Sequence, residues 1–224
     1  MQNLFLIFAY SLNIILRNFL TMYINSDFSR LEINLNGCQA NYKYFRSRLE
    51  DKTKLLVLVK ANAYGHGAVE FATLMEDAGA DYLAVAYPVE GIELRQAGIK
   101  SPIIVLTAGT DSFEQIVNYG LEPGIPNLCS LKELCSVLEK RGLHGFPVHI
   151  KIDSGMHRLG FMTDELKELE DYLKDCPYVK VKSIYSHLAA ADDPSCDDFT
   201  EGQVSLFKNN ADRLSESIGY RPMY

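Results

Sequence analysis

The sequence predicts an α/β protein of repeated strand–helix units, with a (β/α)8 TIM-type barrel as the architecture. From Ser29 onward, short apolar runs alternate with amphipathic stretches, which is the pattern of βαβ units. The first run, residues 55–59, is wholly apolar, as expected for a strand buried on both faces of a parallel sheet. No G-x-G-x-x-G follows this run, which favours a barrel over an open dinucleotide-binding sheet.

The elements follow one another in a regular order. Strands are expected near 55–60, 82–87, 103–107, 121–125, 148–153 and 181–188, where apolar residues are concentrated. Helices are expected at 36–49, 68–78, 89–97, 113–119, 131–140, 164–174 and 199–218, where the pattern is amphipathic. A complete barrel has eight units and takes about 250 residues, so about six of eight units are present. Residues 221–224 fall where a seventh strand should begin, and we expect an incomplete barrel.

The composition is that of an ordinary globular protein. The 224 residues are 47% hydrophobic and 23% charged, which suffices for one sizeable core. The net charge of −7 comes from 22 basic and 29 acidic residues, and it leaves no basic surplus for binding nucleic acid. The five cysteines are an odd number without a C-x-x-C pair, so we expect reduced thiols in a cytoplasmic protein.

Residues 4–16 are almost wholly apolar, which raises the question of a targeting or anchoring segment. A membrane-spanning helix needs about 20 apolar residues, and Arg17 interrupts this run. The basic start and the small-residue cleavage site of a secretory signal are both lacking. We expect residues 1–28 to be an extension outside the fold, in preference to a membrane anchor, and residues 29–224 to form the barrel domain.

A lysine ends the first apolar run. A buried parallel strand would place the amine of Lys60 at the carboxyl end of the strand, where barrels bind ligands. Desolvation lowers the pKa of a lysine and leaves a neutral amine able to attack a carbonyl carbon, so Lys60 is a Schiff-base candidate. The structural alternative is a lysine that reaches from a strand end into solvent. Tyr64 precedes a turn at Gly65 and Gly67, where backbone N–H groups and a helix N-terminus could hold a phosphate.

The string VKANAYGHG, residues 59–67, resembles the pyridoxal-phosphate lysine signature of the alanine racemases. By this resemblance, Lys60 bonds covalently to the cofactor and Tyr64 contacts its phosphate. His66 lies within the string, and we expect it only to stabilise the turn or cap a helix.

A second motif surrounds the end of the fifth strand. Residues 149–153, HIKID, alternate so that the polar side chains share one face of the strand. The following loop contains Arg158, whose planar donors suit a carboxylate or a phenolate oxygen. An ion pair of Lys151 with Asp153 inside the barrel is the structural alternative. KIDSGMHRLG, residues 151–160, resembles a second alanine racemase segment, in which the arginine lies against the phenolic oxygen and the substrate and the lysine is often carbamylated to become its negative partner.

The sixth strand ends at a histidine. SHLA, residues 186–189, places His187 at the same carboxyl edge as Lys60 and Arg158, although a hydrogen-bonded structural role is the alternative. SHLA resembles the next alanine racemase block, whose histidine stacks on the pyridine ring. We expect no metal site, because the histidines and Asp153 do not match a known ligand spacing.

The resemblance covers residues 29–224, the amino-terminal barrel region of alanine racemases. It implies an isomerase that interconverts L-alanine and D-alanine with pyridoxal 5′-phosphate and supplies D-alanine for peptidoglycan. It implies catalytic roles for Lys60 and Arg158, and cofactor contacts for Lys60, Tyr64, Arg158 and His187. In that family the second base is a tyrosine from a carboxyl-terminal β domain of the partner subunit in a homodimer. These 224 residues contain no such domain, so we expect a partial enzyme that does not racemise alanine efficiently by itself.

Three alternatives stay open. Single-domain pyridoxal-phosphate-binding proteins share the barrel, have a similar length and manage cofactor supply without strong catalysis. A membrane-tethered scaffold is supported only by the apolar first segment. Racemisation of serine or another amino acid is the third, because substrate choice depends on contacts partly outside this chain.

Overall fold

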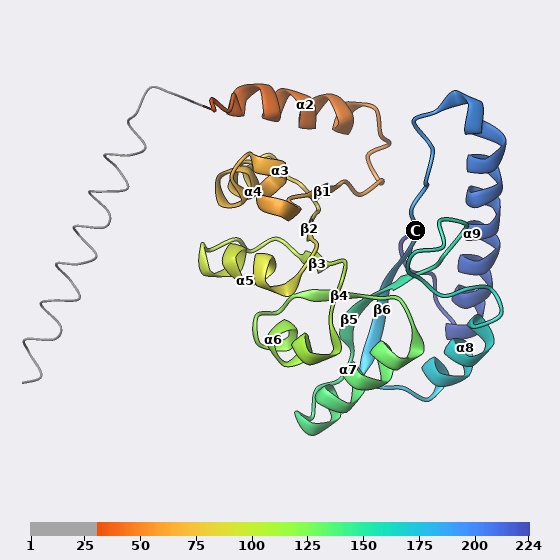
Figure 1. Ribbon diagram of the computed structural model, residues 1–224. Coiled ribbons are helices and arrows are strands. Elements are labelled where there is room, and N and C mark those ends of the chain that lie inside the picture. Colours follow the sequence, from red (N-terminus) through yellow and green to blue (C-terminus); the bar gives the residue numbers. More distant parts are fainter. Residues whose placement is uncertain (1–30) are drawn as a thin grey trace, which may run out of the picture. The chain divides into compact units, whose positions relative to one another are not determined.

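The computed structural model describes residues 31–224, and the expectations for residues 1–28 lie outside the described residues. Six parallel strands form one sheet in the order β1-β2-β3-β4-β5-β6, so each strand pairs with the next one along the chain. This arrangement confirms the predicted α/β fold and gives a partial barrel (Figure 1). The strands are β1 Leu56–Leu58, β2 Tyr82–Val85, β3 Ile103–Val105, β4 Glu122–Ile125, β5 Phe146–Lys151 and β6 Val179–Tyr185.

Helices connect the strands and lie along the outside of the sheet (Figure 1). They are α2 Leu35–Ser47, α3 Lys60–Gly65, α4 Ala68–Asp77, α5 Pro88–Gln96, α6 Phe113–Asn118, α7 Leu128–Lys140, α8 Leu166–Lys174 and α9 Asp197–Ile218. Two short 3-10 turns, η1 Thr110–Ser112 and η2 Pro194–Cys196, precede α6 and α9. The seven predicted helices are present within a few residues of their expected bounds, whereas α3 and the two 3-10 turns were not predicted.

The core lies between the helices and the strands. All three residues of β3 are buried, as expected for a strand covered on both faces. Helix α7 packs one face against the core. Its residues Leu131, Leu134 and Leu138 recur at one-turn spacing and are fully buried. Asn127 begins this helix by accepting a hydrogen bond from the Ser130 N–H at 2.9 Å.

The two end strands of the sheet differ in their surroundings. Leu56 and Leu58 of β1 remain 37% and 39% exposed, although the sequence predicts a buried strand. Beside β6, Met223 pairs in parallel: its N–H donates to Lys182 O at 3.0 Å, and its carbonyl accepts from the Ile184 N–H at 2.8 Å. Met223 therefore occupies the place at which the sequence predicts the start of a seventh strand.

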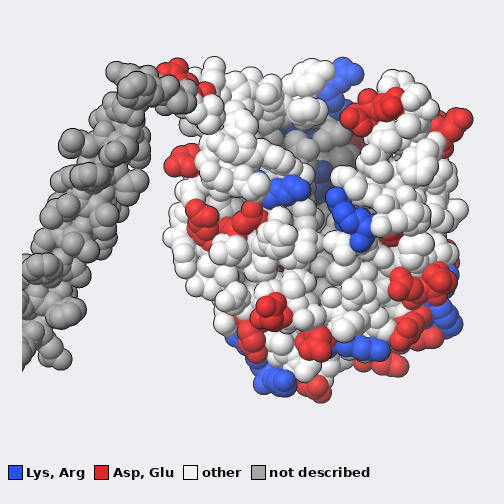
Figure 2. Space-filling view, viewed as in Figure 1, with Lys and Arg blue, Asp and Glu red and all other residues white. Residues whose placement is uncertain are grey.

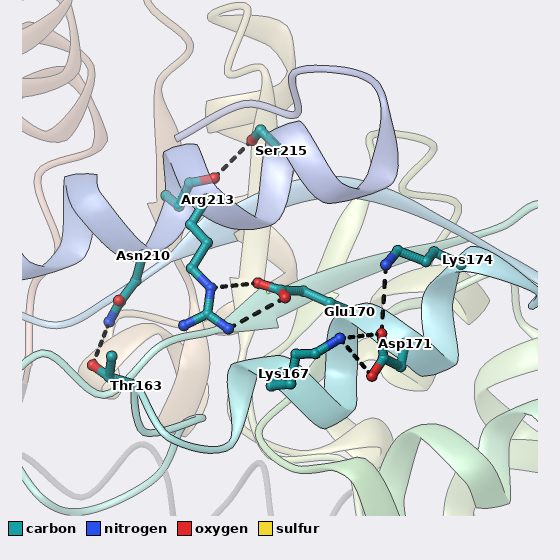
Figure 3. A network of polar contacts seen from close by, with 9 residues as sticks. Thr163, Lys167, Glu170, Asp171, Lys174, Asn210, Arg213 and Ser215 are labelled. Carbon is teal, nitrogen blue, oxygen red and sulfur yellow. Dashed lines mark hydrogen bonds and ion pairs between the residues drawn. The ribbon is translucent and has the colours of Figure 1, made fainter.

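Polar contacts join α8 to α9 (Figure 3). Nε of Arg213 lies 2.7 Å from Oε1 of Glu170, whose side chain is only 9% exposed. Nearby, Asn210 donates to the Thr163 hydroxyl at 2.9 Å. A buried carboxylate needs such a partner, because an unpaired buried charge is strongly destabilising. Within the described chain, every helix is too short or too polar to cross a bilayer.

Candidate active site

The carboxyl ends of the strands surround a cavity of about 630 Å³. Four of the residues singled out in the sequence line it together: Lys60, Lys151, Arg158 and His187. Leu56 and Leu58 of β1 and Ile104 of β3 form an apolar part of the remaining wall. Figure 2 shows lysine and arginine side chains around a hollow on this face, with acidic side chains near its upper right edge and over much of the remaining surface.

Lys60 follows β1 and begins a segment of unusual handedness. It is half-buried at the cavity wall, at the carboxyl end of an end strand of the sheet, which is less burial than a strand covered on both faces would give. The next four residues, Ala61–Tyr64, all have left-handed helical backbone angles, with φ between 50° and 55°. Each such non-glycine residue costs about 1–2 kcal/mol, so the surrounding structure must hold this segment in place.

Several hydrogen bonds hold the left-handed segment. The Ala61 N–H donates to the Glu90 carboxylate at 2.6 Å, and the Asn62 side chain accepts from the Ala68 N–H at 2.7 Å. His66 forms the end of the segment, and its Nδ1 lies 2.8 Å from the Ala63 carbonyl. Because a carbonyl can only accept, Nδ1 carries the proton. The capping role expected for His66 is therefore confirmed.

Tyr64 lies apart from the other four site residues. It is not among the residues that line the cavity, and it is 60% exposed. Its ring centroid lies 5.9 Å from Nζ of Lys60, so it remains beside the lysine. The hydroxyl is thus available to a group that extends outward from Lys60.

Lys151 is the buried cation of the cavity. It ends β5 and is only 9% exposed. Burial lowers the pKa of Lys151, and the positive charges of Arg158 and Lys60 lower it further, while Asp153 opposes them. At a given pH, a larger fraction of this amine is therefore neutral than in an ordinary exposed lysine. Its Nζ also lies 5.8 Å from the centroid of the Tyr185 ring.

The loop after β5 holds Arg158 at the cavity. Asp153 anchors the loop by accepting backbone hydrogen bonds from Gly155 at 2.9 Å and His157 at 3.1 Å. Burial raises the pKa of Asp153, but these hydrogen bonds outweigh it and the net pKa is lowered. Asp153 therefore stabilises the loop, in addition to its charge interaction with Lys151. At Gly160 the chain returns so close to the strand that a Cβ atom would lie 2.6 Å from the Asp153 nitrogen.

His187 follows the end of β6 and lines the same cavity. Burial is the largest cause that lowers the pKa of His187. The positive charges of Arg158, Lys151 and Lys60, in decreasing order, lower it further. The histidine is therefore neutral at pH 7. A neutral ring can pack against an aromatic ligand without adding to the positive charge of the site.

One feature of the cavity and one feature near it were not predicted. Tyr185 lines it, and the buried hydroxyl of this tyrosine has no hydrogen-bond partner in the described chain. Its place on β6 two residues before His187 was the available signal, since alternate residues share a strand face. Deeper in the barrel, His149 bridges the Ser183 hydroxyl at 2.6 Å and the Glu122 carboxylate at 2.8 Å. That histidine shares the HIKID pattern with Lys151 but is fully buried in a structural network. Residues 31–224 contain no cluster of three or more histidine, cysteine or acidic side chains suited to a metal ion.

Comparison with known proteins gives consistent matches. Residues 33–224 match the family described as alanine racemase, N-terminal domain. The alanine racemase of Synechocystis sp. is 41% identical over 170 residues, which cover 74% of this chain and 45% of that protein. That of Lactobacillus delbrueckii subsp. bulgaricus is 40% identical over 182 residues, covering 80% and 48%. The chain thus spans about half the length of the curated relatives it matches.

Solved structures agree with the sequence matches. Alanine racemase from Clostridium difficile 630 in complex with cycloserine superposes with a TM-score of 0.78 at 34% identity, over 86% of this chain and 53% of that one. The enzyme from Bacillus anthracis with bound L-Ala-P gives a TM-score of 0.76 at 28% identity, over 85% and 49%.

Proposed function

The chain belongs to the alanine racemase family, and on this premise we propose that it forms the pyridoxal-phosphate-binding barrel of an enzyme that interconverts L-alanine and D-alanine. The observation that best supports the proposal is the convergence of Lys60, Lys151 and Arg158 on one cavity. No carboxylate side chain of the described residues lines that cavity. The site therefore attracts an anionic ligand.

The residues fit pyridoxal 5′-phosphate, which combines an aldehyde, a phosphate and a phenolic oxygen. Lys60 supplies an amine for the aldehyde, and Arg158 supplies donors for the phenolic oxygen. The buried Tyr185 hydroxyl offers a further hydrogen bond, and a buried polar group normally has a partner. In our assignment, His187 packs on the ring and Tyr64 contacts the phosphate.

The chain's own residues would divide the work of racemisation. Bound pyridoxal phosphate draws electrons away from the α-carbon of the amino acid, which makes the α-proton removable. Lys60 would accept or return that proton on one face. Arg158 would stabilise the negative charge that develops as the proton leaves. Inversion needs a second proton-transferring group on the other face, which we place outside residues 1–224.

Lys151 has a separate role in the proposal. Its lowered pKa enlarges the fraction of neutral amine, the form that reacts with carbon dioxide. A bond forms between Nζ and the carbon of carbon dioxide, and one proton is released. The resulting carbamate is negative and would pair with Arg158. Carbon-13 NMR after addition of labelled bicarbonate tests this, since a carbamate signal should appear and should be lost in Lys151→Ala.

The setting of the enzyme is also part of the proposal. Cys38, Cys129, Cys135, Cys176 and Cys196 are all free thiols, which fits the reducing cytoplasm. We propose a homodimer in the full-length protein, following the shared active site of the family, and a supply of D-alanine for peptidoglycan as its role.

The experiment uses the full-length protein with Lys60→Ala and a matched control, Lys208→Ala, which removes an exposed lysine of α9. We expect bound-cofactor absorbance and alanine racemisation in the wild type and the control, and neither in Lys60→Ala. Absence of bound cofactor in the wild type would contradict the proposal. Cofactor binding without racemisation of alanine would instead favour a protein of cofactor supply, and faster racemisation of serine would reassign the substrate.

A separate assay tests where the second proton-transferring group lies. Residues 1–224, purified alone and supplied with pyridoxal phosphate, should racemise alanine far more slowly than the full-length protein. Equal rates would show that the second group lies within these residues.

A further inference from the structure

We infer that Glu90 is a positioning residue for Lys60, an inference that rests on the function proposed for that lysine. Glu90 occupies the first turn of α5, and its carboxylate joins the ends of two strands. Oε1 accepts the Ala61 N–H at 2.6 Å, directly after Lys60. Oε2 accepts the N–H groups of Ala86 at 2.7 Å and Tyr87 at 2.9 Å, directly after β2.

Of these three contacts, the hydrogen bond from the Ala61 N–H matters most for Lys60, because it lies at the next residue along the chain. Ala61 is the first residue of the left-handed segment, so the chain changes handedness directly after Lys60. L-amino acids resist this conformation, and a hydrogen bond to a carboxylate is stronger than one between neutral groups. The bond to Ala61 therefore holds the backbone from which the Lys60 side chain enters the cavity. Because Ala86 and Tyr87 also line the cavity, Glu90 couples two parts of its wall.

The chemistry of the contact requires a carboxylate. All three groups bound by Glu90 are N–H donors, and a carboxylate accepts on both oxygens. A glutamine has one accepting oxygen and one donating amide. In Glu90→Gln the oxygen should stay with Ala86 and Tyr87, where it makes two hydrogen bonds. The amide group would then face the Ala61 N–H, donor against donor.

The substitution thus disconnects the Lys60 segment while leaving the start of α5 capped. Glu93→Gln is the matched control, because it makes the same change of charge on the same helix at an exposed position. Glu90→Ala, which removes all three contacts, measures the combined effect. These variants separate loss of the Ala61 contact from general destabilisation.

The first measurement is amide hydrogen exchange of the full-length protein without added cofactor. We expect Glu90→Gln to lower protection at Ala61 by about tenfold, equivalent to ~1.4 kcal/mol, while Ala86 and Tyr87 change little. Glu93→Gln should leave all three unchanged. Unchanged protection at Ala61 in Glu90→Gln would overturn the inference, and so would an equal loss of protection throughout α5, which indicates a purely structural cap.

The second measurement follows Lys60 itself. Each protein is incubated with pyridoxal phosphate, reduced with borohydride, and digested, and mass spectrometry gives the labelling rate at Lys60 relative to the other lysines. We expect about a tenfold lower relative rate in Glu90→Gln and the wild-type rate in Glu93→Gln. A wild-type rate in Glu90→Gln would overturn the inference. If wild-type Lys60 is not labelled selectively, the proposed function fails, and the exchange measurement still decides whether Glu90 holds this segment.

Discussion

Replacement of Gly160 by alanine tests whether a close backbone approach holds the Arg158 loop in place. Gly160 has φ +131°, and an added Cβ would lie 2.6 Å from the Asp153 nitrogen and 2.8 Å from the Ile152 carbonyl carbon. Both contacts are with backbone, which cannot rotate away. Backbone strain at residue 160 costs about 1–3 kcal/mol, and moving the strand and the loop apart costs more. We therefore expect the free energy of unfolding to fall by about 3–5 kcal/mol in total.

The matched control is Gly142→Ala, because Gly142 also has a positive φ, +63°, but an added Cβ would meet nothing within 4 Å. Gly142→Ala should lower the free energy of unfolding only by the strain of the left-handed backbone, about 1–2 kcal/mol. Urea unfolding of the full-length proteins gives both values, and the midpoint of thermal unfolding should fall further in Gly160→Ala than in Gly142→Ala. If the two variants lose equal stability, the close approach at Gly160 does not constrain the loop.

Three further predictions concern charge. Arg213→Ala leaves its carboxylate partner on α8 without a cation and should cost about 1–3 kcal/mol in urea unfolding, whereas Lys167→Ala, which breaks an exposed ion pair, should leave the stability nearly unchanged. The hydrogen bond from Cys135 lowers the pKa of Cys176 to about 6. The rate of alkylation of Cys176 should therefore be half-maximal near pH 6, and in Cys135→Ala it should reach half of its maximum only at a higher pH. An unchanged pH dependence in Cys135→Ala would contradict the contact between the two thiols. The pKa of His187 is lowered, so the folded protein binds a proton at this histidine less readily than the unfolded chain does. NMR should therefore show His187 titrating below pH 6.5, and titration above pH 6.5 would refute this. The stability that the neutral ring contributes should be lost as pH falls through the folded-state pKa.

Most elements could be predicted because their packing follows local sequence patterns. The buried strand β3 and the amphipathic helix α7 have the apolar spacing that their surroundings demand. The bounds of α7 were less accurate, because its start depends on the cap at Asn127 rather than on periodicity. The exposure of Leu56 and Leu58 could not be seen in the apolar run, since it depends on which strand lies beside β1.

The site shows a similar division. Lys60, Arg158 and His187 could be placed at one edge because parallel strands all end on the same side of a sheet. The left-handed turn could not be predicted, because alanine and tyrosine have no preference for positive φ. Its cause is partly distant in sequence: Glu90 supplies an acceptor 29 positions after Ala61. A single-sequence pattern does not contain such a contact.

The charges of the cavity link its stability to its ligand. Arg158 lowers the pKa values of both Lys151 and His187, which means that the cations of the site repel one another. Folding must hold these groups together against that repulsion, and the bonds of Asp153 to its loop are part of what does so. An anion bound among them would offset the repulsion and raise both pKa values. Anion binding should therefore stabilise the fold and make His187 easier to protonate, because it offsets the part of the pKa lowering that comes from the neighbouring cations, although not the larger part that comes from burial.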